Sequence, residues 1–279
     1  MCQFCVQHGD GKAWYLQAEN YVASLEDDLE RREYIIDFVQ GFSEKQPGRL
    51  RGLQLLDQIP APLSSLAKKH LTAKQKKHHF GQPVPIEECE QILEFATSVV
   101  RLPCVCRTAA GTPDNGYCLA VTVGPVDGTL KEAFAGYEGG PDTGAFQNLT
   151  KEETLTVLRQ CEKEGLMHSV WTFGSPLIAA ICNCNIESGC MAMATTVTHD
   201  LKTMWRGEYV IDLDETACTN CGACERRCPF GALSFNRKEK RLSVDLKACY
   251  GCGTCRSACS ADALTLLPRA ESPTMAKVW

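Results

Sequence analysis

The sequence CTNCGACERRCP, residues 218–229, recurs in altered form as CYGCGTCRSACS, residues 249–260. Each run contains three cysteines at steps of three residues and a fourth cysteine four residues later. Thiolates are the soft ligands that iron–sulfur clusters prefer, and cysteines at this spacing wrap a tight, amide-rich turn around a cluster. Eight such thiolates predict two cubane [4Fe-4S] clusters and therefore a chain that moves electrons.

The two runs belong to an internal repeat, because Cys249 follows Cys218 by 31 residues. Each half contains a short strand pattern, then the cysteine run opening a helix, then a second strand pattern. The strand patterns are YVIDLD and ALSFN in the first half, and RLSVDL and LTLL in the second. We therefore expect a pseudo-twofold pair of βαβ units.

Residues 207–268 closely resemble the bacterial two-cluster ferredoxins, down to Cys228-Pro229 and to Gly222 and Gly253 in the turns. In one departure, Ser260 stands where that family usually has a second proline. The resemblance implies that the last cysteine of each run crosses to the other cluster. It thus implies one ligand set of Cys218, Cys221, Cys224 and Cys259, and a second of Cys249, Cys252, Cys255 and Cys228.

Two other cysteine frameworks fit the spacing less well. Zinc ribbons use two CxxC pairs, typically without a third and fourth cysteine in fixed step. Disulfide frameworks belong to secreted chains, and the N-terminal sequence MCQFCVQHGDGK lacks the apolar segment of a signal peptide. The 18 cysteines are therefore interpreted as ligands or free thiols in a reducing cytoplasm, and oxygen-labile clusters indicate an anaerobe.

Composition limits the classes of partner. No stretch approaches the roughly 18 apolar residues that a membrane-spanning helix needs, and the formal net charge of −5 argues against nucleic acid. The basic run KKHLTAKQKKHH, residues 68–79, is interpreted as a solvated helix face or a docking surface for an acidic partner. No ligand role is assigned to its histidines. The expected partner is another redox protein or a larger oxidoreductase complex.

The length of 279 residues leaves room for about two domains, and the 44% hydrophobic content can build their cores, so the ferredoxin-like segment is a minority of the chain. Apolar residues at helical spacing predict an amphipathic helix over 14–40, a short helix between Gly48 and Pro60, and a third over 63–77. A linker is expected near 81–85, where Gly and Pro recur.

From Pro85 onward, helical patterns alternate with short apolar strand patterns, which predicts a small α/β unit. The segment TKEETLTVLRQCEKEG, residues 150–165, is expected to form a helix that is capped by Thr150 and ends in GLMHSVW. The fold class is therefore α+β, with a mainly helical region at 1–82, a Cys-rich α/β domain at 83–206, a two-cluster domain at 207–270 and a tail at 271–279. The tail is expected to be frayed or to dock a partner.

A second group of cysteines lies in the middle of the chain. Two CxC pairs, Cys104 with Cys106 and Cys182 with Cys184, stand at the ends of apolar strand patterns. Because strand side chains alternate with period two, each pair presents both thiols on one face, and neighbouring strands would bring four thiols together. Cys118 and Cys190 lie close in sequence to these pairs and are candidates to replace members of this set or to add to it. Such a pocket suits a third iron–sulfur cluster or a zinc ion, whereas the alternative is ordinary core packing.

This segment also resembles a Cys-rich domain that precedes ferredoxin modules in proteins of anaerobes. The resemblance rests on PCVCR at 103–107, on an EE-rich helix leading into GLMH at 165–168, and on CNCNIESGC at 182–190. The last stretch has fewer thiols than is usual in such proteins. The resemblance therefore implies the domain and no particular ligand set or activity.

A third, smaller group comprises Cys2, Cys5 and His8, which form part of a metal site or belong to an unliganded terminus. Cys89 and Cys161 lie in helical patterns and are expected in the core. The glycine-rich stretch from Gly136 lacks the strand and helix context of a phosphate loop and is interpreted as a surface loop.

Three functions fit these patterns. The first is an electron-transfer subunit that passes low-potential electrons through two clusters and a further centre. The second is a reductase in which Cys104, Cys106, Cys182 and Cys184 hold an open, substrate-reducing metal and Arg101 and Arg107 hold an anionic substrate. The third is a zinc-stabilised interaction module. No flavin, nucleotide or nucleophile–base motif is visible, which favours electron transfer.

Overall fold

The computed structural model describes residues 13–21, 29–96, 98–112, 116–122, 147–174 and 177–278. Helices and strands both contribute substantially, in agreement with the predicted α+β class. Among the described residues, none of the helices is long and apolar enough to span a membrane. Cys2, Cys5, His8 and the glycine-rich stretch from Gly136 lie outside the described residues.

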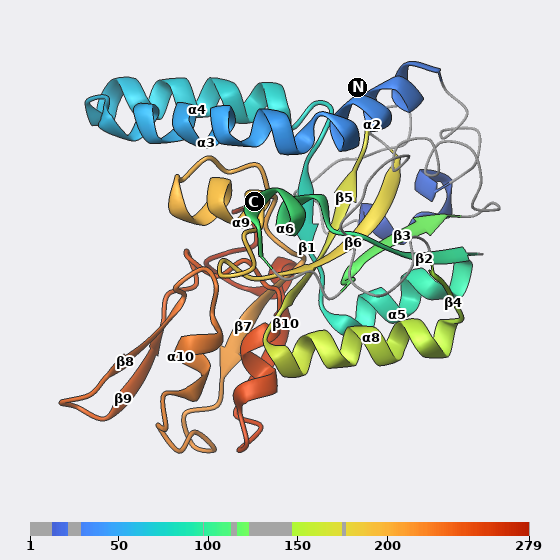
Figure 1. Ribbon diagram of the computed structural model, residues 1–279. Coiled ribbons are helices and arrows are strands. Elements are labelled where there is room, and N and C mark those ends of the chain that lie inside the picture. The colour runs from blue at the N-terminus through green and yellow to red at the C-terminus, as the bar shows by residue number, and fades with distance from the viewer. Residues whose placement is uncertain are drawn as a thin grey trace.

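A six-stranded sheet occupies the centre of the molecule (Figure 1). Its strand order is β1-β5-β6-β3-β2-β4, and every neighbouring pair is antiparallel. Helices cover both faces, so most strand positions are apolar, and the strict alternation of a half-exposed sheet is missing. The strands are β1 (Gly81–Pro83), β2 (Ser98–Leu102), β3 (Cys118–Thr122), β4 (Gln147–Leu149), β5 (Met167–Thr172) and β6 (Ile178–Cys184).

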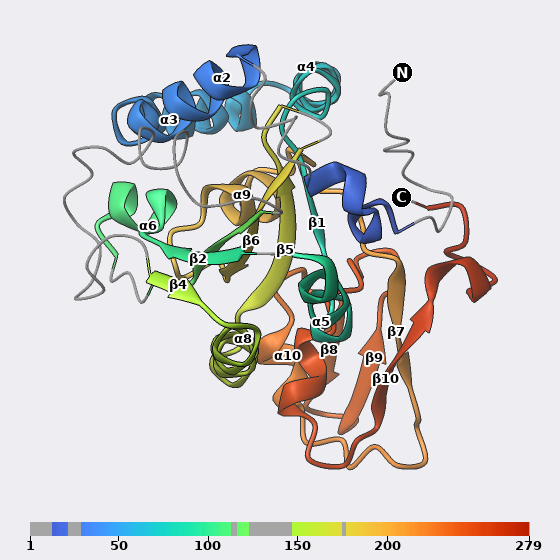
Figure 2. The ribbon, with the colours of Figure 1, turned by 90° about the vertical axis from the view of Figure 1, so that its right-hand side faces the viewer.

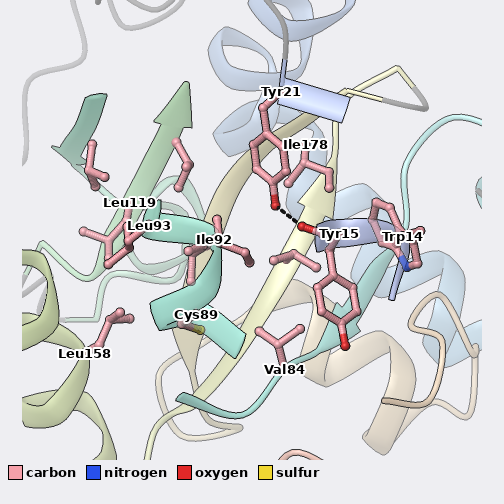
Figure 3. Packing of buried hydrophobic residues seen from close by; sticks show 14 of the residues in the cluster. Trp14, Tyr15, Tyr21, Val84, Cys89, Ile92, Leu93, Leu119, Leu158 and Ile178 are labelled. Carbon is pink, nitrogen blue, oxygen red and sulfur yellow. Dashed lines mark hydrogen bonds between the residues drawn. The ribbon is translucent and has the colours of Figure 1, made fainter. Parts of the chain in front are cut away.

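One face of the sheet packs against α5 (Ile86–Phe95) and α8 (Lys151–Glu164), with two short 3₁₀ helices beside them (Figures 2 and 3). These 3₁₀ helices are η1 (Trp14–Leu16) and η2 (Ala18–Tyr21). The Tyr21 hydroxyl donates a hydrogen bond to the Tyr15 carbonyl at 2.8 Å (Figure 3). Thr150 caps α8 through a reciprocal capping box with Glu153, which confirms the predicted helix start.

The other face packs against α2 (Leu29–Gln40), which contributes Ile35 and Val39 to a buried cluster with Val100 and Leu102 of β2. Beyond α2, the helices α3 (Phe42–Gln58) and α4 (Ala61–Gln75) lie side by side (Figures 1 and 2). The short helix α6 (Val105–Ala110) contacts α3.

Two N-terminal helix predictions need correction. The single helix expected over 14–40 is not present: the described residues of this stretch form two 3₁₀ helices and the helix α2. The boundary expected at Gly48 lies inside α3, which also contains Pro47. Pro47 and Gly48 are unfavourable inside a helix, but α3 buries Phe42, Gln46 and Leu53, and this tertiary packing outweighs the local preference. The third predicted helix, over 63–77, is present as α4.

The segment 81–85 is not the expected linker, because its first three residues form β1, an edge strand buried against β5. A Cβ added to Gly81 would lie 2.4 Å from the Trp171 ring, so the glycine allows this close approach. Pro83 is tolerated because an edge strand leaves one row of backbone donors unpaired. Strand β1 therefore crosses the domain boundary predicted at residue 82.

The sequence patterns do not predict β5, because GLMHSVW is expected to end the preceding helix. All six β5 residues are buried, and the strand pairs on both sides. The basic run is likewise not a uniformly solvated face. His79 is buried among aromatic rings, including Phe38 at 4.7 Å and Trp171 at 5.2 Å between centroids. The Lys76 ammonium lies 3.5 Å from the centre of the Trp205 ring.

The C-terminal part forms two small antiparallel sheets, one of β7 with β10 and one of β8 with β9 (Figure 1). The first strand of the repeat thus pairs with the last, which ties the two halves together. Met275 of the tail is buried in an apolar cluster with Val210 of β7 and Leu264 of β10, so the described part of the tail is packed and not frayed. The elements are β7 (Tyr209–Leu213), α10 (Ala223–Arg227), β8 (Leu233–Asn236), β9 (Arg241–Val244), η4 (Thr254–Ala258), β10 (Leu264–Pro268) and η5 (Arg269–Glu271).

Candidate iron–sulfur sites

Two cavities lie between the two small sheets, and each is lined by four cysteines. The first, which we call the inner cavity, is lined by Cys228, Cys249, Cys252 and Cys255. The second, which we call the outer cavity, is lined by Cys218, Cys221, Cys224 and Cys259. Each cavity therefore takes three cysteines from one run and the fourth cysteine of the other run, which is the grouping that the ferredoxin resemblance implies.

Backbone amides point at the cysteine sulfurs in a nearly symmetric pattern. The Cys228 sulfur accepts from the Ala232 amide at 3.2 Å, and the Cys259 sulfur accepts from the Ala263 amide at 3.3 Å. The Cys249 sulfur accepts from the amides of Ile211 and Gly251, both at 3.4 Å. Amide donors stabilise a cluster-bound thiolate. The donor set and the sulfurs therefore fit a [4Fe-4S] cluster in each cavity.

The missing proline at Ser260 does not disturb its turn. The Asp262 amide donates to the Cys259 carbonyl at 3.3 Å, as the Gly231 amide donates to the Cys228 carbonyl at 3.4 Å in the turn that contains Pro229. The two turns thus have equivalent hydrogen bonds, and the departure from the ferredoxin pattern leaves the fourth cysteine in place.

The two cavities differ in exposure and in neighbouring charge. Cys221 of the outer cavity is exposed, whereas Cys249 and Cys255 of the inner cavity are each 7% exposed. Burial raises the pKa of the inner thiol of Cys252 to about 12, so iron or another cation is needed to hold its thiolate at neutral pH. Arg206 donates to the Cys249 carbonyl at 2.9 Å and places a fixed positive charge beside the inner cavity.

The wall of the inner cavity reaches the six-stranded sheet. Phe230 and Tyr250 line the cavity and stack on each other, with ring centroids 4.1 Å apart and an interplanar angle of 8°. Tyr250 also belongs to a buried cluster with Cys184 and Cys190 of the middle segment. We call the six cysteines of the middle segment the upstream cysteines; they are Cys104, Cys106, Cys118, Cys182, Cys184 and Cys190. The inner cavity therefore shares one apolar region with two of them, Cys184 and Cys190.

Polar contacts fix this arrangement between the two parts of the chain. Arg256 of η4 forms a two-pronged salt bridge with Glu87 of α5, at 2.7 and 2.9 Å. Ser257 donates to the Glu162 carbonyl of α8 at 3.2 Å. Fork-to-fork pairing of arginine and carboxylate adds geometric specificity. The cysteine repeat is thus held in a defined orientation against α5 and α8.

The upstream cysteines lie on other elements than the two neighbouring strands that the sequence predicts. Cys104 and Cys106 are not on a strand, because β2 ends at Leu102 and Cys104 precedes α6. Strands β2 and β6 are not neighbours either, since β3 lies between them. Cys118 of β3 stands directly opposite Cys182 of β6. Cys182 and Cys184 of β6 do share one face of the sheet, as strand alternation requires.

The remaining candidates are two helical cysteines and two arginines. Cys89 and Cys161 are fully buried in helices, as expected for core residues. Arg101 donates to the Gly116 carbonyl at 2.7 Å, and the Arg107 guanidinium lies 5.8 Å from the centre of the Tyr117 ring. Throughout the described part of the chain, no three His, Cys, Asp or Glu residues are arranged to hold a single metal ion.

A buried carboxyl near the inner cavity escaped the sequence interpretation. Glu88 of α5 is 4% exposed and accepts hydrogen bonds from the hydroxyls of Tyr15 and Tyr209, the latter at 2.9 Å. Desolvation raises the pKa of Glu88 to about 7 despite these bonds. In sequence Glu88 is one of several acids on an amphipathic helix, and only the tertiary structure places two tyrosines around it.

We expect Glu88 to make stability decrease with pH. The folded protein holds a proton on Glu88 up to about pH 7, whereas the unfolded chain loses it near the ordinary glutamate pKa of 4.5. The stabilisation is therefore present below pH 4.5 and is lost as the pH rises through 7, by about 3 kcal/mol in total at 1.36 kcal/mol per pKa unit. Glu88→Gln should remove this loss, so that the variant melts higher than the parent at pH 8.5 and nearly equally at pH 4.5. Anaerobic thermal melts at both values measure it, with Glu94→Gln on the exposed side of α5 as control. Parallel pH profiles of parent and variant would contradict the assignment.

Comparison with protein families agrees with the geometry of the cavities. Residues 210–260 match the family model of the 4Fe-4S dicluster domain. A comparison with curated proteins gave no match to the chain. The matched residues include all eight cysteines of the two cavities and begin after Cys190, the last of the upstream cysteines. Residues 210–260 therefore form a ferredoxin-type iron–sulfur domain that binds [4Fe-4S] clusters, with a role in electron transfer.

Proposed function

We propose that the chain carries two [4Fe-4S] clusters with crossed ligand sets and passes low-potential electrons between them as a subunit of a larger, cytoplasmic redox complex of an anaerobe. The observation that supports this most strongly is the pair of cavities, each with four cysteine sulfurs drawn from both halves of the repeat.

The difference in exposure supports a direction for the electrons. An external donor or acceptor reaches the outer cluster first, because Cys221 is exposed. The inner cluster then connects this surface to the six-stranded sheet through Phe230 and Tyr250. Hydrogen bonds to sulfur, charge and solvent exposure set cluster potentials, so the two clusters should titrate at different potentials.

Reduction of anaerobically purified protein tests the proposal. We expect about eight irons per chain, the sum for two cubanes, and a low-temperature EPR spectrum broadened by coupling between two reduced clusters. A redox titration should resolve two one-electron steps. About four irons, or a spectrum of one isolated cluster, would overturn the two-cluster assignment. Co-purification under the same conditions identifies the partner of the complex.

The reductase alternative is kept because the inner cavity and the upstream cysteines share a buried cluster. In that case the middle domain would hold an open metal that receives electrons from the inner cluster. The ligands of that site decide between the two functions, because four thiolates close the site and leave no position for a substrate.

A further inference from the structure

Six cysteines from three separate parts of the chain gather on one face of the six-stranded sheet. Cys104 and Cys106 come from the start of α6, Cys118 from β3, and the others from β6 and the turn that follows it, Cys182, Cys184 and Cys190. Cys104, Cys184 and Cys190 are each at most 7% exposed. No short-range constraint in the sequence requires these segments to meet at cysteines.

Contacts between the thiols separate four of the six from the other two. The Cys106 thiol contacts those of Cys104 and Cys190, and Cys190 also contacts Cys184, which makes one continuous group. Cys118 and Cys182 form a separate pair, directly opposite each other on β3 and β6. The chain thus provides four thiols in one group and a neighbouring pair.

We propose that Cys104, Cys106, Cys184 and Cys190 ligate a third iron–sulfur cluster, which exchanges electrons with the cluster of the inner cavity. This inference rests on the proposed function, because it needs the inner cluster as its electron source. One electron leaves the reduced inner cluster, which returns to its oxidised state, and the third cluster takes that electron up. No bond forms or breaks, and no further reactant is needed.

The chemistry of the four thiols favours a cluster over ordinary packing. Cys161 shows what a packed cysteine looks like here, since it lies in an apolar cluster with Tyr117 and Leu166. Cys190, by contrast, contacts two other thiols and accepts from the backbone amides of Ala192 and Met193. Amide donors and sulfur neighbours are also what surround the cysteines of the inner and outer cavities.

A cluster also fits better than a single zinc ion. Among the described residues, no group of three or more possible ligands is arranged around one ion, and this applies to the eight ferredoxin cysteines as well. The ligands of a cluster bind different irons and need not converge on one point.

The surroundings provide a buried route from the inner cluster to the third one. Cys184 and Cys190 share an apolar cluster with Met193, Tyr250 and the inner-cavity ligand Cys252. Tyr250 stacks on Phe230, and both rings line the inner cavity. The side chains between the two sites are therefore apolar and packed, which keeps water from the path. With four thiolate ligands the third site is closed and serves as a relay.

Iron and sulfide analysis of the full chain, purified anaerobically, tests the proposal. We expect about ten irons if the third cluster is [2Fe-2S] and about twelve if it is [4Fe-4S]. About eight irons would overturn the third cluster while leaving the proposed function intact, and fewer than eight would contradict the proposed function itself. One zinc per chain with about eight irons would also overturn the proposal.

Matched serine variants identify the ligands. Cys184→Ser and Cys190→Ser should each lose only the extra iron, with the EPR signals of the inner and outer clusters unchanged. Cys161→Ser, a buried thiol outside the group, and Cys182→Ser, from the neighbouring pair, should keep the full count. If Cys182→Ser loses the extra iron while Cys190→Ser keeps it, the ligand set is wrong. The iron count of the parent protein decides the question should a variant fail to fold.

Discussion

Replacing Cys228 with serine is expected to abolish the inner cluster, although Cys228 belongs to the first cysteine run. Its sulfur lines the inner cavity with Cys249, Cys252 and Cys255 of the second run. The iron count should fall by about four, the content of one cubane, and the coupled EPR spectrum should collapse to that of an isolated cluster. Cys252→Ser should give the same result.

The matched control is the symmetric substitution Cys259→Ser. Its sulfur lines the outer cavity, so this variant should lose the outer cluster and keep the inner one. Because the two cavities differ in exposure, the remaining clusters should differ in potential and in their rate of reaction with external oxidants. If Cys228→Ser and Cys221→Ser left the same cluster, each run would bind its own cluster and the crossed arrangement would be wrong.

The second large effect is expected from Gly251→Ala, in the turn between Cys249 and Cys252. Gly251 has φ +72°, and an added Cβ would lie 2.0 Å from the Tyr209 carbonyl oxygen. The backbone of β7 cannot give way without moving the Ile211 amide, which donates to the Cys249 sulfur. Strain of the left-handed conformation and the clash together should destabilise the domain by about 3–5 kcal/mol and weaken the inner cluster.

Gly231→Ala provides the comparison within the same domain. Gly231 has φ +67°, but an added Cβ would meet nothing within 4 Å. Only the conformational strain remains, about 1–2 kcal/mol. Anaerobic urea unfolding, followed by cluster absorbance, measures both variants. Equal losses of stability would show that contact with Tyr209 is unimportant.

Residue spacing was sufficient to predict most of the iron–sulfur domain. Eight cysteines in two equal runs have few other uses, and thiolate chemistry restricts their ligands to soft metals. The capped helix α8 was equally predictable, since Thr150 and Glu153 act within four residues of each other. Such features are local, so their physics is contained in a short window of sequence.

The middle of the chain was harder to predict for a physical reason. A sheet covered on both faces has apolar strands without alternation, so β5 was mistaken for the end of a helix. The same lack of a local signal turned β1 into an expected linker. The place of Cys104 depends on where β2 ends and α6 begins, and the pairing of Cys118 with Cys182 depends on strand order.

The amino-acid sequence by itself therefore determined the cysteine runs, their repeat and the chemistry of their ligands. The tertiary structure alone decided which of the upstream thiols meet, that the inner cavity faces them through Phe230 and Tyr250, and that Glu88 is buried between two tyrosines. Ligand type is a property of each side chain, whereas proximity between distant segments arises only when the sheet and its helices pack.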